Sequence, residues 1–240
     1  MALSGAQLFA RYAYPPNELG YCGPPDASVL LGRGPSADEA IVRHARRFEG
    51  AWAYLELIAV AAGIGDPLDP RVVEAYWVGN DLLDLIGGAD VARQLQDRLP
   101  PQPGASWFAG AAHHGYQVFS VYPWVGLLAK ARGNPAAALD ILQQCRIRWG
   151  EVVGIAGVRV EVRSAPLEVI EGRLALGEPC VDTAALTMDG RAQIGDTVSM
   201  HWDWVCDVLG PDQVTQLRAY TLEQLLAAND VLTGSRSKIS

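Results

Sequence analysis

The stretch Val152–Val162, VVGIAGVRVEV, marks where this chain changes from helical to strand periodicity. Apolar residues alternate with polar or small ones on both sides of Gly157, which is typical of two short strands joined by a tight turn. Short apolar runs at 167–170 and 174–176 continue the strand pattern, and residues 211–232 return to a helical period. The sequence therefore predicts a small OB-like β-barrel closed by a C-terminal helix.

The residues before position 145 have helical periodicity instead. A capping box at Ser36–Glu39 predicts the start of one continuous helix that reaches Ala62. Asp69 followed by Pro70 predicts the N-cap and the first position of another helix. The segment Tyr12–Pro25, which is rich in Pro, Gly and Tyr, is predicted to form an irregular arm.

These patterns together predict an α+β protein of two domains. An all-helical domain with the irregular arm is expected over residues 1–144, and the barrel with its C-terminal helix over residues 145–240. The chain has 240 residues and is 50% hydrophobic, so each part has enough apolar material for a core of its own.

The composition excludes several classes of protein. The net charge is −8 at pH 7 and no stripe of Lys and Arg interrupts it, so we expect no nucleic-acid partner. No apolar run reaches the roughly eighteen residues of a membrane span. The first residues lack a basic segment followed by an apolar one, so no export signal is expected. Four well-separated cysteines without a CxxC pair then indicate free thiols in the cytoplasm.

Several catalytic motifs are missing from the sequence. It contains no GxxxxGK[ST], GxGxxG or GxSxG, so nucleotide-dependent and α/β-hydrolase chemistry is not predicted. It also lacks HExxH, the spacing of zinc proteases.

The pair His113-His114 is the most conspicuous polar feature of the helical half, with Tyr116 and Tyr122 nearby. Adjacent residues of a helix point about 100° apart, so we do not expect both to bind one metal ion. In one interpretation, one histidine is hydrogen-bonded in the core and the other is exposed. In the other, His113 or His114 has a catalytic or metal-binding role. Cys22 is a further candidate as a reactive thiol.

Two runs in the C-terminal half carry the most specific pattern. Cys145 opens the run CRIRWGEVVGIAGVRVEV, at the point where the helical half gives way to the first strand. His201 ends a strand within the run IGDTVSMHWDWVCDVLGPDQVTQLRAYTLEQLLA, which continues into a helix. These runs resemble the HypC/HybG family of [NiFe]-hydrogenase maturation chaperones, over residues 145 to about 226. The family's Pro-Gly pair is replaced here by Trp149-Gly150, and the likeness dissolves between Leu167 and Thr187.

The resemblance implies a specific chemistry. In that family the first cysteine and the strand histidine handle the Fe(CO)(CN)2 unit of the hydrogenase, together with a scaffold protein and the hydrogenase large subunit. Carried over, these metal-binding roles fall on Cys145 and His201. A thiolate is a soft ligand for iron, and an imidazole nearby can complete the site.

Three hypotheses about function therefore stand side by side. The first is an accessory protein for metalloenzyme assembly, which binds a transient iron fragment at Cys145 and His201. The second is an enzyme with its active site around His113 and His114. The third is a structural subunit that uses the aromatic stretch at Trp202 and Trp204 as its partner-binding anchor.

The placement of two side chains discriminates between these hypotheses. Proximity of Cys145 and His201 at an exposed site favours the accessory protein, and burial of both in the barrel core favours the structural subunit. A deep polar pocket at the histidine pair favours the enzyme. The Cys145 thiol is expected to be reachable by solvent beside an imidazole, and therefore to react with an alkylating reagent at neutral pH faster than Cys180 or Cys206.

Overall fold

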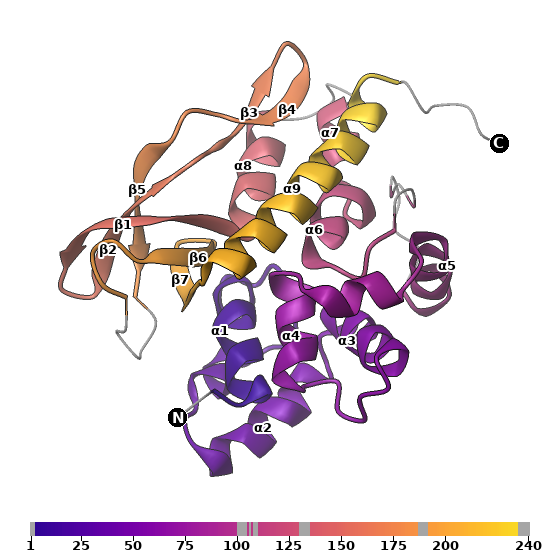
Figure 1. Cartoon of the computed structure of the whole chain (residues 1–240), viewed down its shortest axis with the longest axis vertical. Coiled ribbons are helices and arrows are strands. Elements are labelled where there is room, and N and C mark those ends of the chain that lie inside the picture. The colour runs from indigo at the N-terminus through magenta and orange to yellow at the C-terminus, as the bar shows by residue number, and fades with distance from the viewer. Residues whose placement is uncertain are drawn as a thin grey trace. The chain divides into compact units, whose positions relative to one another are not determined.

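The computed structural model describes residues 3–99, 105, 107, 110–129, 135–186 and 192–234 of the chain. The fold is α+β, with N-terminal helices followed by a small β-barrel and a C-terminal helix (Figure 1). Contacts divide the chain into two compact units, Met1–Pro100 with Gly110–His114 and Pro101–Ala109 with Gly115–Ser240. We refer to them as the N-terminal and the C-terminal unit.

The described part of the N-terminal unit is built from helices around an aromatic core. The helices are α1 (Gly5–Glu18), η1 (Ala27–Leu31), α2 (Pro35–Ala45), α3 (Glu49–Ala61), α4 (Pro70–Trp77), η2 (Asp81–Leu85) and α5 (Gly88–Arg98). Phe9, Tyr12 and Tyr54 are fully buried, and the Tyr12 ring stacks on Trp77 with centroids 5.4 Å apart. Asp69 caps α4 as predicted, because its carboxylate accepts the backbone N–H of Arg71 at 2.9 Å.

Three sequence predictions in this unit are wrong, and the first concerns the irregular arm. Much of the predicted irregular arm is helical, because α1 extends through Pro15 and Pro16 to Glu18 and only the residues after it are irregular. Burial of Tyr12 and Ala13 offsets the backbone hydrogen bonds that the prolines cannot donate.

The predicted continuous helix that ends at Ala62 is two helices. The chain leaves helical geometry between α2 and α3, where Phe48 has ψ of 79° and packs edge-on against the Phe9 ring at 5.3 Å. The predicted capping box at Ser36–Glu39 does not cap α2, since Gly34 is the N-cap residue and Pro35 the first helical position.

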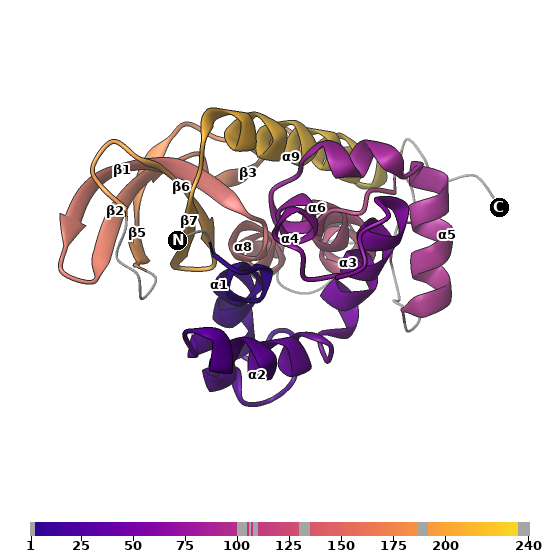
Figure 2. The ribbon, with the colours of Figure 1, turned by 60° about the horizontal axis from the view of Figure 1, so that its bottom comes forward.

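The barrel of the C-terminal unit has five strands in the order β1-β2-β5-β7-β6, and β6 closes onto β1. They are β1 (Arg148–Ala156), β2 (Arg159–Ser164), β5 (Cys180–Ala185), β6 (Thr197–His201) and β7 (Trp204–Val208). All neighbours pair antiparallel except β5 and β7, which is the five-stranded Greek-key arrangement of an OB-like barrel. Figure 2 shows β1 curving around this group of strands. Valines, alanines and Met200 fill the interior.

A second core of the C-terminal unit lies outside the barrel interior. It joins the π-helix η3 (Gln117–Val121), which follows the short α6 (His114–Tyr116), to α7 (Trp124–Ala129), α8 (Pro135–Cys145), α9 (Pro211–Leu232) and the hairpin of β3 (Leu167–Ile170) and β4 (Arg173–Leu176). Phe119, Leu142, Leu174 and Leu225 are among its buried residues. In Figure 1 the β3–β4 hairpin projects away from the barrel strands, near α8 and α9.

This second core explains where the two units divide. The sequence pattern changes at residue 145, but the division by contacts falls beside His114. Helices α7 and α8 belong with the barrel because their apolar faces pack against α9 and the β3–β4 hairpin. A change of periodicity locates a change of element type, whereas packing decides which elements form one unit.

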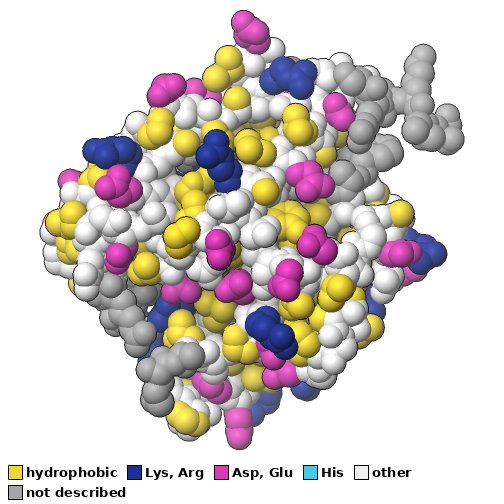
Figure 3. Space-filling model, in the orientation of Figure 1, with side chains coloured by type: hydrophobic (Ala, Val, Ile, Leu, Met, Phe, Trp, Pro, Cys, Tyr) yellow, Lys and Arg dark blue, Asp and Glu magenta, His cyan; other side chains and the backbone are white. Residues whose placement is uncertain are grey.

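The surface agrees with the acidic composition. On the face drawn in Figure 3, Lys and Arg side chains stand apart from one another, with acidic and apolar side chains between them. Within the described residues, no helix combines the length and the apolarity that a membrane crossing needs.

Candidate metal-binding site

The topology of the barrel brings Cys145 and His201 together. Cys145 is the last residue of α8 and lies shortly before β1, and His201 is the last residue of β6. Strands β1 and β6 pair antiparallel, with Arg148 opposite Met200. The end of β6 therefore lies beside the start of β1, and residues distant in sequence become neighbours.

The two potential ligand atoms are close and both residues are buried. The Cys145 sulfur and an imidazole nitrogen of His201 lie within 4.8 Å of each other. Cys145 is 8% exposed and His201 is 1% exposed. A tetrahedral zinc ion, at about 2.3 Å from sulfur and about 2.1 Å from nitrogen, holds the two ligand atoms about 3.6 Å apart, so an approach of at most about 1.2 Å lets both bind one ion.

A strained turn follows His201. Residues 202 and 203 join β6 to β7, and Trp202 has φ of +55°, a left-handed conformation that costs a non-glycine residue about 1–2 kcal/mol. The Trp202 N–H donates to the Gln144 carbonyl at 2.9 Å, and its own carbonyl accepts from the Arg148 guanidinium. These bonds tie the residue after His201 to the residue before Cys145. Strain of this kind tends to occur at functional sites.

Two buried arginines follow Cys145 in the sequence. Arg146 donates to the Ala165 carbonyl at 2.6 Å and to Gln143 Oε1 at 3.1 Å, and both acceptors are neutral. Burial, and then the charge of Arg148, lower the pKa of Arg146 to about 9, so it stays cationic at neutral pH. Arg148 forms an ion pair with Asp182 at 2.7 Å. This side of Cys145 therefore carries positive charge.

The glycine of the Trp149-Gly150 pair has a steric reason. A Cβ added to Gly150 would lie 2.5 Å from the Arg163 carbonyl oxygen on the neighbouring strand β2. Strands β1 and β2 pair here with Gly150 opposite Ser164. Only glycine allows this close approach.

The cysteines differ in exposure, and one expectation is wrong. Cys145 is buried beside the apolar side chains of the second core, so its thiol is not the readily reachable one that we expected. Cys180, on β5, is exposed, and Cys206 is fully buried. Burial raises the pKa of the Cys22 thiol to about 12, which argues against Cys22 as a reactive thiolate.

The two tryptophans after His201 lie in different environments. Trp202 is 8% exposed and its backbone belongs to the strained turn, whereas Trp204 is half-buried at the start of β7. Trp202 therefore presents little surface to a partner. Their partner-binding role stays a prediction.

The pair His113-His114 lies in an aromatic environment. Burial, and then the charge of His114, lower the pKa of His113 to about 3, so His113 is neutral at physiological pH. The Nδ1 atom of His114 lies 3.2 Å from the Tyr76 hydroxyl, and its ring centroid lies 4.6 Å from that of Trp77. Both histidines are buried, so the predicted exposed member of the pair is not found.

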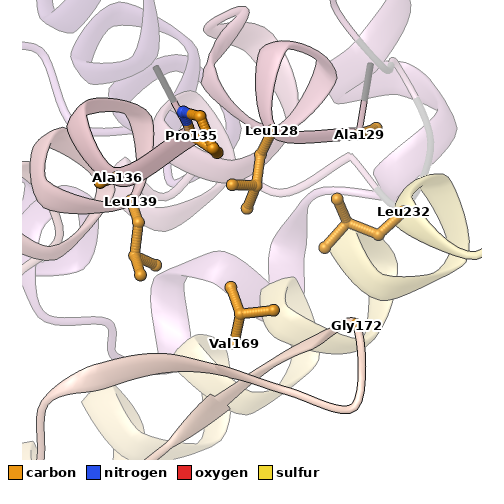
Figure 4. A pocket seen from close by; sticks show the side chains of 8 residues that line it. All are labelled: Leu128, Ala129, Pro135, Ala136, Leu139, Val169, Gly172 and Leu232. Carbon is orange, nitrogen blue, oxygen red and sulfur yellow. The ribbon is translucent and has the colours of Figure 1, made fainter. Parts of the chain in front are cut away.

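A separate cavity of the C-terminal unit is apolar. It has a volume of about 380 Å³ and lies among α7, α8, the β3–β4 hairpin and the end of α9 (Figure 4). Its lining consists of Leu128, Ala129, Pro135, Ala136, Leu139, Val169, Gly172 and Leu232. It contains none of the predicted site residues.

Sequence reasoning missed Arg148. The available signal was a charged residue at the start of a strand in which apolar residues otherwise alternate, close behind Cys145. A charge at such a position is buried only with partners, and Gln144, Asp182 and Trp202 come from elements whose pairing the sequence did not give.

Comparison with known proteins identifies the family of the chain but no characterised relative. No curated protein and no solved structure matches the chain. The model of one protein family, described as a family of unknown function (DUF6390), matches residues 1–235. The helical part and the barrel thus occur together in one family model, and the chain belongs to this family of unknown function.

Proposed function

We propose that this protein binds a transition-metal ion through the Cys145 thiolate and the His201 imidazole and serves as a cytoplasmic accessory protein in metalloenzyme assembly. The observation that carries the proposal is the separation of at most 4.8 Å between the two ligand atoms. Sulfur and imidazole ligands together favour iron, zinc, copper and nickel over magnesium and calcium. A neighbouring cation favours the thiolate form of a cysteine, and the buried Arg146 directly follows Cys145 in the sequence.

A site with only two protein ligands suits a protein that passes its metal on to a partner. Structural zinc sites are closed by four protein ligands, whereas Cys145 and His201 leave positions for other groups. Such positions can hold small ligands of a metal fragment or a side chain of a partner. The site is not exposed as the accessory hypothesis expected, but neither residue belongs to the cluster that fills the barrel interior, so loading and release need a local opening of this end of the barrel.

The finer proposal is a role in [NiFe]-hydrogenase maturation. The cargo is then an Fe(CO)(CN)2 fragment, and the partners are the hydrogenase large subunit or a maturation scaffold protein. The likeness to the HypC/HybG chaperones supports it, since the chain has an OB-like barrel whose first strand follows the cysteine. The proximity of Cys145 to the histidine at the end of β6 supports it too.

Cobalt binding tests the metal site directly. Reduced protein titrated with Co²⁺ is expected to give a thiolate-to-cobalt charge-transfer band, which zinc then removes. Cys145→Ala is expected to abolish the band and to weaken binding by about 100-fold, or about 2.8 kcal/mol. Cys180→Ala, the change of an exposed cysteine on the same barrel, is the matched control and is expected to bind as the wild type does. Wild-type protein that binds neither Co²⁺ nor Zn²⁺ contradicts the proposal.

Infrared spectroscopy tests the finer proposal. Protein purified without oxygen from cells that express a [NiFe] hydrogenase is expected to carry carbonyl and cyanide stretching bands. The Cys145→Ala protein from the same cells is expected to lack them. If cobalt binds but no such bands appear, the protein handles a metal other than the hydrogenase iron fragment.

A further inference from the structure

We propose that Arg148 is the positioning residue that holds His201 opposite Cys145. This inference rests on the proposed function for its meaning, since a positioned pair matters because it binds metal. The contacts that support it are independent of any metal. Arg148 itself is not a ligand, because its guanidinium has no lone pair to offer.

The guanidinium connects the segments that carry both residues. Its nitrogens donate to Gln144 Oε1 at 3.2 Å and to the Trp202 carbonyl. Gln144 directly precedes Cys145 in α8, and Trp202 directly follows His201. A third bond, to Asp182 Oδ2 at 2.7 Å, anchors the side chain to β5. One side chain thus fixes the ends of α8 and β6 against a third element.

The Arg148 guanidinium is buried, so its charge depends on hydrogen-bond partners. Arg148 is 2% exposed, and the Asp182 side chain is 46% exposed. A buried charge needs partners, and the two terminal nitrogens of the Arg148 guanidinium serve three acceptors in fixed directions, while its Nε is buried without a partner among the described residues. Lysine retains the charge but offers one compact ammonium on a flexible stem. Arg148→Lys therefore keeps the positive charge but removes the planar guanidinium with its fixed donor directions.

The turn at Trp202 makes the position of His201 depend on Arg148. Trp202 is held at φ of +55° by the bond from Arg148 to its carbonyl and by the bond from its N–H to Gln144. A conformation of this kind persists only when the surroundings enforce it. Without the arginine bond, the turn is free to relax, and the adjacent His201 moves with it.

The first test is cobalt binding by the full-length protein. Arg148→Lys is expected to lower the Co²⁺ affinity by about tenfold or more and to change the ligand-field bands, as losses next to a metal site usually do. The matched control is Arg163→Lys, since Arg163 forms an exposed ion pair with Glu151 on the same barrel. The control is expected to keep both the affinity and the bands. A purely structural role for Arg148 would lower the thermal stability and leave the bands of the folded protein unchanged.

The second test needs no metal binding by the native site. His201→Cys places a second thiol near Cys145, and phenylarsine oxide condenses with two neighbouring thiols to form two As–S bonds and release one water. Bridging in the His201→Cys protein is expected to be about tenfold faster than in His201→Cys/Arg148→Lys, in keeping with the loss expected around a metal ligand. His201→Cys/Arg163→Lys is the control and is expected to bridge at the faster rate.

The two tests distinguish the inference from the proposed function. If wild-type protein binds no cobalt but Arg148→Lys slows bridging, the proposed function fails and the positioning role stands. If neither the cobalt bands nor the bridging rate responds to Arg148→Lys, the positioning role is overturned. Should Arg148→Lys fail to fold, Gln144→Ala removes one acceptor of the Arg148 guanidinium. This variant is expected to lower the Co²⁺ affinity and the bridging rate by a smaller factor. An unchanged result for Gln144→Ala then overturns the inference.

Discussion

Two of the buried histidines, His113 and His201, lie in different environments. Burial, and then the charge of His114, lower the pKa of His113 to about 3, so the neutral form is retained. His201 is equally buried, but a cysteine sulfur lies within 4.8 Å of its ring. We therefore interpret the buried, neutral His113 as a structural residue. His201 is a candidate metal ligand, because a second potential ligand atom lies beside its ring. The predictions below test this contrast.

The largest expected effect is on metal affinity. His201→Ala is expected to weaken Co²⁺ binding by about 100-fold, because it removes one of the proposed ligands. His113→Ala is expected to change the affinity by less than about twofold, since His113 is not one of the proposed ligands. Equal losses in the two variants, measured by calorimetric titration, contradict the contrast.

The next largest effect is on stability at acidic pH. The pKa of His113 is lowered from 6.5 to about 3 in the folded protein, so between these values the unfolded chain binds the extra proton. The contribution of neutral His113 to the free energy of unfolding is fully present above pH 6.5. It is lost as the pH falls from there, at about 1.4 kcal/mol per pH unit.

Denaturant unfolding between pH 6 and pH 4 measures this slope. His113→Asn is expected to lower the stability at pH 7 and to remove this part of the slope. His44→Asn is the comparison, because burial lowers the pKa of His44 as well but by less. A slope that His113→Asn leaves unchanged shows that the proton is taken up elsewhere.

A smaller effect is expected on thiol reactivity. Iodoacetamide is expected to label the exposed Cys180 about tenfold faster than the buried Cys145, because a buried thiol reacts only after a local opening. Bound zinc is expected to protect Cys145 further and to leave the labelling of Cys180 as it was. Mass-spectrometric mapping gives the rates. Labelling of Cys145 ahead of Cys180 would mean that this end of the barrel opens readily.

The smallest effect is expected far from the ligands. Gly172 has φ of +76° in the turn of the β3–β4 hairpin, beside the apolar cavity (Figure 4). Gly172→Ala is expected to lower the free energy of unfolding by about 1 kcal/mol, since alanine tolerates this conformation poorly. Cobalt affinity is expected to stay unchanged. A loss of affinity would show that the hairpin and the metal site are coupled.

The sequence by itself determined the fold class and most local elements of the C-terminal half. The expected strand run at Leu167–Ile170 is β3, the helix over Pro211–Leu232 is α9, and the glycine-containing hairpin is β1 with β2. These elements are readable because alternation, glycine turns and a proline at N1 act within a few residues. The order of Cys145 and His201 within the two runs also came from sequence.

Only the tertiary structure decided how these elements are used. The prolines of α1 and the break at Phe48 follow from burial against residues that no local pattern connects. The close approach of Cys145 and His201 depends on the pairing of β1 with β6 and on the bonds of Arg148. The burial of Cys145 depends on a core that joins α7, α8, α9 and a hairpin. These are contacts between distant parts of the chain, and their free energies appear only once the chain has folded.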